Sequence, residues 1–190
     1  MTSSQKIRPL FSCLLCSFLL IIDVASAGED NQGNVTDARV INSPLEEPGS
    51  WLTYGQNYKE QRFSQLTQIN TDTVDRLGLA WTKQIGDYNM RMQGTPLVVD
   101  GIMYVTNGWS VIYALDATTG EEIWIYDPEV DRSYIRLACC GPAHNRGVAV
   151  YEGKVFVGTF DGRLIAVDAN TGQEVWDVDT WIPAGLGRFN

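Results

Sequence analysis

The chain has 190 residues, of which 44% are hydrophobic and 19% are charged, with a formal net charge of −9 and an isoelectric point near 4.5. This is the composition of a soluble protein with enough apolar residues for a core, so it excludes a disordered tail, a collagen-like rod and a multi-span membrane protein. An acidic chain repels phosphate backbones, which argues against nucleic acid as a partner.

The first 27 residues have the pattern of an export signal. Lys6 and Arg8 make the N-terminus positively charged, and an uncharged apolar run follows over 10–22. Residues 25–27 have the small side chains that are typical of a signal-peptide cleavage site. The run is short for a bilayer span, although an uncleaved anchor is the alternative. We therefore expect a signal peptide over 1–27, an exported protein, and no membrane span after cleavage.

The segment after the signal is expected to fold only in part. Residues 28–50 are polar and mostly acidic, which predicts a flexible leader. Folded character begins at Trp51. Residues 70–77 predict a capped helical turn that Gly78 would end, and residues 79–83 predict a strand.

An internal repeat is the strongest organisational signal, because residues 101–124 align with residues 153–176 without a gap. Each copy predicts four short strands, and antiparallel units with a period of roughly 40 to 55 residues are typical of β-propeller blades. A two-sheet sandwich is the alternative, but it requires no regular repeat. The identical pairs include Asp116 and Asp168, Gly120 and Gly172, and Trp124 and Trp176, and the expected strands are 95–99, 102–106, 111–116 and 122–126 in the first unit and 148–151, 155–158, 164–168 and 174–177 in the second.

Turn residues support these strands, and the spacing of tryptophans locates an enlarged connection. Asp100-Gly101 is a two-residue hairpin signal, and Gly120 ends a turn that suits a positive φ. Trp81 matches Trp124 as the last strand of a preceding unit. The next tryptophan of the repeat follows at a longer spacing, so the extra residues lie within 127–146, and connections on a rigid scaffold usually carry function.

That connection holds Cys139 and Cys140, the only cysteines outside the predicted signal. Adjacent Cα atoms are about 3.8 Å apart, closer than the roughly 4.4–6.8 Å of ordinary disulfides, so a bond between them would close a small strained ring. Such a ring would be rigid and could form a flat wall beside a ligand. Two free buried thiols and two separate intermolecular bonds are the alternatives.

Several segments resemble one family. The most specific is Cys139-Cys140 followed by Asn145-Arg146-Gly147, and the others are residues 51–55, 62–64, 68–81, 95–101 and 158–164. On these motifs, residues 51–179 resemble the pyrroloquinoline-quinone (PQQ)-dependent alcohol dehydrogenases.

The resemblance implies a fold and a cofactor site. The fold is an all-β, eight-bladed β-propeller, of which residues 51–190 would supply two to three blades. PQQ would lie in the central funnel against a vicinal disulfide ring, which Cys139 and Cys140 match. Arg146 matches the arginine that hydrogen-bonds the quinone carbonyl oxygens, a role that suits a permanently charged, fork-shaped guanidinium; a surface salt-bridge arginine is the alternative.

Three departures from the family pattern are visible. Gln93 stands where the family commonly has a cofactor-contacting glutamate, and it keeps the hydrogen-bonding capacity without the charge, or is merely a polar residue before a strand. One extra residue separates Cys140 from Asn145, and His144 or a neighbour is the insertion. His144 is expected as an exposed loop histidine, and as the only histidine it excludes a multi-histidine metal site. The family's calcium ligands and catalytic aspartate lie further along than Asn190, so we expect a fragment that is inactive alone.

The resemblance therefore predicts a periplasmic dehydrogenase. It would oxidise a small alcohol to an aldehyde by hydride transfer to PQQ, with calcium polarising the quinone carbonyl and a cytochrome c accepting the electrons. The alternative is a non-catalytic propeller that serves as a periplasmic assembly scaffold. That class needs neither adjacent cysteines nor the Asn-Arg-Gly block, and these residues favour the dehydrogenase.

Overall fold

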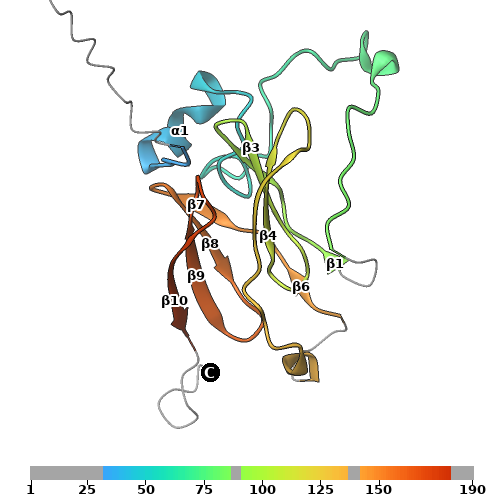
Figure 1. The fold of residues 1–190 in the computed structure, drawn as a ribbon. Helices are drawn as coiled ribbons and strands as arrows, with labels where there is room; N and C mark the ends of the chain where they lie inside the picture. The colour runs from blue at the N-terminus through green and yellow to red at the C-terminus, as the bar shows by residue number, and fades with distance from the viewer. Residues whose placement is uncertain (1–31, 87–90, 137–141, 181–190) are drawn as a thin grey trace, which may run out of the picture. The chain divides into compact units, whose positions relative to one another are not determined.

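The computed structural model describes residues 32–86, 91–136 and 142–180 (Figure 1). The chain separates into two compact units, residues 1–30 and 31–190, and every described residue belongs to the second. The predicted signal peptide and both cysteines of the connection lie outside the described residues. The helices are α1 (Asp37–Glu46), the 3₁₀ helix η1 (Val74–Arg76) and the 3₁₀ helix η2 (Arg132–Arg136). Across these ranges, no helix has the length and apolar character to cross a membrane.

Two four-stranded antiparallel sheets form the centre of the described structure, and each is a meander whose strands pair in chain order. All eight strands predicted for the two repeats are present, which confirms the all-β fold and the blade interpretation. The first sheet consists of β2 (Leu97–Val99), β3 (Ile102–Thr106), β4 (Ile112–Asp116) and β5 (Glu122–Tyr126), and the second of β7 (Ala149–Tyr151), β8 (Lys154–Gly158), β9 (Arg163–Asp168) and β10 (Glu174–Asp179).

The predicted turns have the expected backbone geometry. Asp100 and Gly101 both have positive φ, at 52° and 78°, as a tight turn between β2 and β3 requires. After β4, the Asp116 carboxylate accepts hydrogen bonds from the backbone N–H groups of Thr118 (2.8 Å) and Thr119 (2.7 Å). The turns therefore fix the strand register locally, within each repeat.

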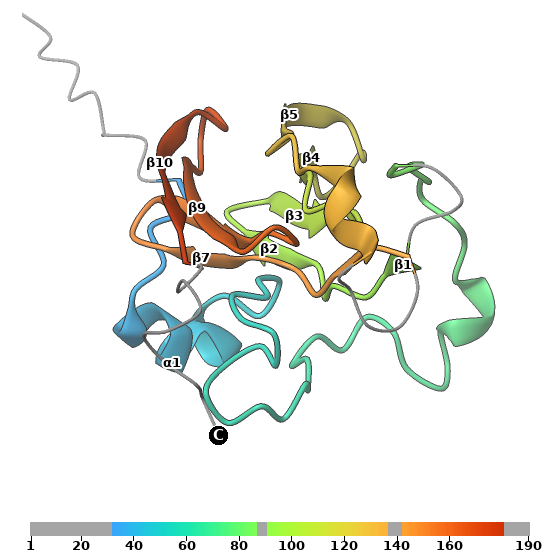
Figure 2. The same ribbon diagram turned by 90° about the horizontal axis from the view of Figure 1, so that it is seen from below.

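The two sheets lie side by side (Figure 2). They share one cluster of buried hydrophobic side chains. Tyr104 and Trp124 of the first sheet lie 5.8 Å apart between ring centroids, and both donate a hydrogen bond of 3.1 Å to the carbonyl oxygen of Ala169 in the second. The Trp124 ring lies directly against Gly172. The rest of the shared core includes Leu97, Val99, Ile112, Ala114, Val155, Val157, Ile165 and Val167.

Trp81 repeats this arrangement one unit earlier. Its indole N–H donates to the carbonyl oxygen of Ala117 at 3.3 Å, and its ring lies against Gly120. The predicted strand over 79–83 is nevertheless absent, because a strand requires a hydrogen-bonded neighbour and no described segment pairs with these residues. The prediction of a helical turn before Gly78 is confirmed by η1.

The prediction of a flexible leader fails for residues 32–50, which contain α1. The side chain of Thr36 caps the helix by accepting from the backbone N–H of Arg39. Val35 and Val40 are each 1% exposed and belong to the core. Composition does not show which apolar residues of a mostly polar segment become buried, which explains why the prediction was wrong.

Arg39 fixes α1 to the β2–β3 turn. Its guanidinium donates to the Glu47 carboxylate at 2.7 and 2.8 Å and to the Asp100 carboxylate at 2.5 Å. The hydrogen bonds from Arg39 hold the pKa of Glu47 below its usual value. Burial raises the pKa of Asp100, but hydrogen bonds from Arg39 and from the backbone N–H of Gly33 outweigh it, and the net pKa is lowered.

Replacing Arg39 with methionine is expected to lower the free energy of unfolding at pH 7 by about 1–2 kcal/mol, because four hydrogen bonds to carboxylates disappear from a partly exposed site. A carboxylate whose pKa is lowered by folding stabilises the fold above its unfolded pKa, and this stabilisation is lost as the pH falls through the folded value. The stability lost in Arg39→Met should therefore become smaller when the pH falls below 3.8, the ordinary pKa of an aspartate. Urea unfolding at pH 7 and pH 3 measures it.

Lys83→Met is the matched control, because Lys83 makes one exposed ion pair with Glu122 at 3.1 Å. Its effect at pH 7 should be within about 1 kcal/mol of zero. An Arg39→Met loss of the same size at both pH values would contradict the proposed electrostatic link.

Candidate functional site

A short parallel strand pair that the sequence did not predict positions the candidate site. Strand β1 (Arg91–Met92) pairs with β6 (His144–Asn145) in the register Arg91 to His144 and Met92 to Asn145. Strands of two residues carry no periodic pattern, so only the tertiary fold reveals this pair. It joins the segment before the first sheet to the enlarged connection before the second.

Two of the predicted site residues lie at the neighbouring C-terminal ends of these two parallel strands. Gln93 comes directly after β1 and Arg146 directly after β6, and both are exposed. A Cβ atom on the next residue, Gly94, would lie 2.9 Å from the backbone nitrogen of Gly147, so the two backbones are in contact. The structure thus brings Gln93 and Arg146 together, whereas Cys139 and Cys140 lie outside the described residues.

Arg146 does not behave as a structural salt-bridge arginine. Among the described residues, five ion pairs are formed and none includes Arg146. The surface salt-bridge alternative is therefore unsupported for the described part of the chain. A guanidinium without a carboxylate partner keeps its donors available for an oxygen-bearing ligand.

Asn145 is the buried residue at the site, and sequence reasoning gave it no separate role. Its side-chain oxygen accepts from Thr106 Oγ1 at 2.9 Å and from the backbone N–H of Gly147 at 2.8 Å. Its side-chain nitrogen donates to Ser110 Oγ at 3.0 Å and to the carbonyl oxygen of Gly158 at 2.9 Å. The only sequence signal was its place directly before Arg146.

A cavity of about 230 Å³ opens beside Arg146. His144 lines it as a half-buried residue of β6, which corrects the expectation of an exposed loop histidine. Its ring centroid lies 6.4 Å from that of Phe160, in an edge-to-face arrangement. The lining residues are Ser110, His144, Asn145, Arg146, Gly158, Thr159 and Phe160.

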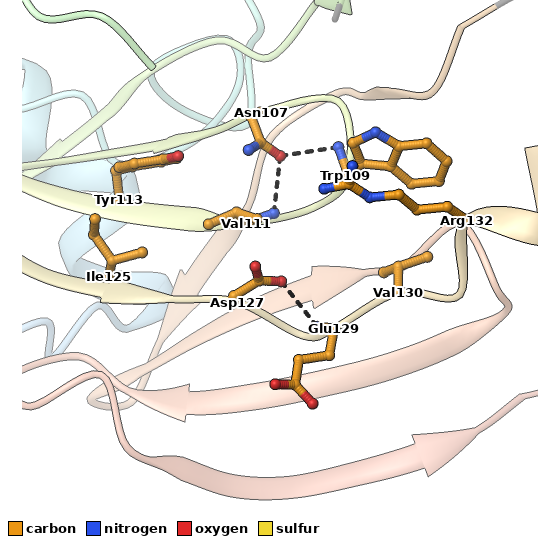
Figure 3. A pocket seen from close by; sticks show the side chains of 9 residues that line it. All are labelled: Asn107, Trp109, Val111, Tyr113, Ile125, Asp127, Glu129, Val130 and Arg132. Carbon is orange, nitrogen blue, oxygen red and sulfur yellow. Dashed lines mark hydrogen bonds between the residues drawn. The ribbon is translucent and has the colours of Figure 1, made fainter. Parts of the chain in front are cut away.

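A second cavity, of about 300 Å³, is lined by residues of β4 and β5 and of the segments before and after these strands (Figure 3). Asn107 is 3% exposed, and its side-chain oxygen accepts from the backbone N–H groups of Trp109 and Val111. The Arg132 guanidinium lies 5.5 Å from the Trp109 ring centroid. Trp109 also contacts Phe160 at 5.9 Å between centroids, so an aromatic wall separates this cavity from the one beside Arg146.

The described side chains of the site can donate hydrogen bonds to the oxygens of an organic ligand. The guanidinium of Arg146 and the amide of Gln93 can both donate to carbonyl or carboxylate oxygens. In the residues open to description, no three His, Cys, Asp or Glu side chains gather closely enough to hold a metal ion. The arrangement therefore offers directed donors to a ligand that carries carbonyl or carboxylate oxygens.

Comparisons with known proteins identify the family of the chain. Residues 51–178 match the family model of the glucose/ethanol/alcohol dehydrogenase β-propeller domain, named PQQ. The chain is 48% identical over 172 residues to the quinohemoprotein alcohol dehydrogenase ADH-IIG of Pseudomonas putida, covering 90% of this chain and 24% of that protein. It is 50% identical over 134 residues to 1-butanol dehydrogenase (cytochrome c) of Thauera butanivorans, covering 70% of this chain and 19% of the relative.

Solved structures give the same result. The quinohemoprotein alcohol dehydrogenase ADHIIG of Pseudomonas putida HK5 is similar with a TM-score of 0.77 and 51% identity, over 82% of this chain and 22% of that one. The chain spans about a quarter of the length of these relatives.

Proposed function

Since the chain belongs to the PQQ family of glucose/ethanol/alcohol dehydrogenase β-propellers, we propose that it serves in the oxidation of an alcohol to an aldehyde in the periplasm, with PQQ bound beside Arg146. The observation that carries this proposal is the pairing of β1 with β6. In that pairing Gln93, in the segment before the first sheet, and Arg146, in the connection between the two blades, follow neighbouring strands.

Each of these residues would have a separate role in holding the cofactor. Bound PQQ would supply the two-electron oxidising chemistry that amino-acid side chains lack. Arg146 would hold carbonyl oxygens through its charged donors, and Gln93 would add a neutral hydrogen bond where the family commonly uses a carboxylate. Cys139 and Cys140 would form the flat wall of the site.

The metal and the electron acceptor complete the proposal. Calcium would polarise the carbonyl that accepts the hydride, and we expect its ligands outside the described residues. A cytochrome c is the proposed acceptor, and a net charge of −9 is compatible with a basic partner. The name of the Thauera butanivorans relative also includes cytochrome c.

The test is reconstitution of the protein expressed from its complete gene. The protein freed of cofactor is loaded with PQQ and Ca²⁺, and ethanol-dependent reduction of an artificial electron-accepting dye is measured. We expect dye reduction that requires both PQQ and alcohol. A folded protein that binds no PQQ would instead support the non-catalytic scaffold.

A vicinal disulfide would appear in a single tryptic peptide, residues 137–146, because Arg136 and Arg146 flank the sequence that holds both cysteines. Without reductant, we expect this peptide to be lighter than the dithiol form by two hydrogen atoms and to resist alkylation. After reduction it should take up two alkyl groups. Mass spectrometry also distinguishes the alternatives, since free thiols would be alkylated without reductant and intermolecular bonds would give cross-linked peptides.

A further inference from the structure

The orientation of Arg146 depends on the residue before it. The Arg146 side chain is exposed and makes no ion pair within the described ranges. Asn145, by contrast, is 9% exposed and makes four hydrogen bonds of 2.8–3.0 Å. An asparagine amide offers two donor hydrogens and an oxygen that accepts two bonds, so its capacity is completely used.

The partners of Asn145 come from both blades. Thr106 ends β3 and Ser110 lies in the turn that follows, so both belong to the first sheet. Gly158 ends β8 of the second sheet, and Ser110 Oγ also lies 3.3 Å from its carbonyl oxygen. One side chain therefore connects the ends of two blades at the point where Arg146 leaves β6.

The fourth contact fixes the turn that contains Arg146 itself. The backbone N–H of Gly147 donates to the Asn145 side-chain oxygen, and Gly147 has a φ of 108°, which L side chains rarely adopt. Arg146 thus lies between Asn145, whose side-chain amide makes all four of its hydrogen bonds, and Gly147, whose backbone N–H donates one of them. Its backbone is held on both sides while its side chain remains available to a ligand.

We propose that Asn145 is a positioning residue: by joining the two blades it holds Arg146 ready for the carbonyl oxygens of the quinone. Only an amide satisfies this set of partners, because a carboxylate would place an acceptor against the Gly158 carbonyl, and alanine would leave buried partners unpaired. The proposal rests on the proposed function for the identity of the ligand.

The main test is a double-mutant cycle on the protein expressed from its complete gene, with PQQ affinity measured by quenching of tryptophan fluorescence. Asn145→Ala should weaken PQQ binding about tenfold, because misplaced binding groups lose affinity. In the Arg146→Ala background it should cause no further weakening. Asn145→Asp, which keeps the size of the side chain, is the second variant and should follow the same pattern.

Trp124→Phe is the matched control for a purely structural role. It removes an inter-blade hydrogen bond, from the Trp124 indole to Ala169, at a turn distant in sequence from Arg146. The control should lose stability and bind PQQ like the wild type. Equal weakening by Asn145→Ala in both Arg146 backgrounds, or no weakening at all, would overturn the proposal.

A second measurement needs no cofactor. Trypsin cleaves after Arg146, and cleavage of a folded protein requires local opening of the segment. Relative to cleavage after Arg163 in β9, cleavage after Arg146 should become about tenfold faster in Asn145→Ala and stay unchanged in Trp124→Phe. An unchanged ratio in Asn145→Ala would refute the positioning role, whereas a wild-type protein that binds no PQQ would refute only the proposed function.

Discussion

Gly172→Ala should lower the free energy of unfolding by about 2–5 kcal/mol, since it combines backbone strain with overpacking. Gly172 has a φ of 69°, and a Cβ atom built on it would lie 2.6 Å from Cδ2 of the Trp124 ring. Trp124 is 8% exposed, packs against Tyr104 and is hydrogen-bonded to Ala169. The ring therefore cannot move away without breaking the contact between the two sheets.

Gly153→Ala separates the two causes. Gly153 lies in the turn between β7 and β8 of the same sheet and has a φ of 73°. No atom lies within 4 Å of the position that its Cβ would take. It should lose only the conformational part, about 1–2 kcal/mol. Urea unfolding of both variants measures the difference. Equal losses in the two variants would mean that the close approach of Trp124 to Gly172 contributes nothing to blade packing.

The blades were predictable because their information is local. The Asp100-Gly101 hairpin and the Asp-containing turns lie between consecutive strands of the same repeat and fix their register there. Because the sequence repeats, each strand predicted in the first unit is also predicted at the matching position of the second. This is why all eight strands appear near their expected positions.

The two wrong predictions, the flexible leader and the strand over 79–83, have a different cause. The conformation of each segment depends on contacts with residues distant in the chain. Helix α1 forms where Val35 and Val40 reach the core and Arg39 reaches Asp100, and its acidic composition hid these contacts. Residues 79–83 have the sequence of a strand but no paired neighbour among the described residues. Local pattern thus predicts the conformation that a segment favours, and tertiary contacts decide whether it forms.

The candidate site was predictable only through the resemblance. Nothing in the spacing of Gln93 and Arg146 shows that they meet, because the β1–β6 pair that joins them has two residues in each strand. The resemblance selected both residues and the structure brought them together. It did not select Asn145, whose importance follows from its burial and its four hydrogen bonds.

Arg146→Ala should weaken PQQ binding by about 10- to 150-fold, because a hydrogen bond to a charged group contributes about 1.5–3 kcal/mol. Stability should change little, since the side chain is exposed and unpaired among the described residues. Arg146→Lys keeps the charge but loses the planar fork, so its affinity should lie between those of the wild type and Arg146→Ala. Fluorescence titration with PQQ measures all three proteins.

Arg132→Ala tests whether the effect is specific to Arg146 or follows from the loss of any nearby positive charge. Arg132 carries the same charge at the neighbouring cavity, where it lies over Trp109. If directed donors on Arg146 hold the quinone oxygens, removing Arg132 should change PQQ affinity by less than about threefold. A similar loss in both variants would show that general electrostatic attraction binds the cofactor. Because Gln93 is neutral, Arg146 is the only charged side chain among the candidate site residues, which is why its removal should have the largest effect there.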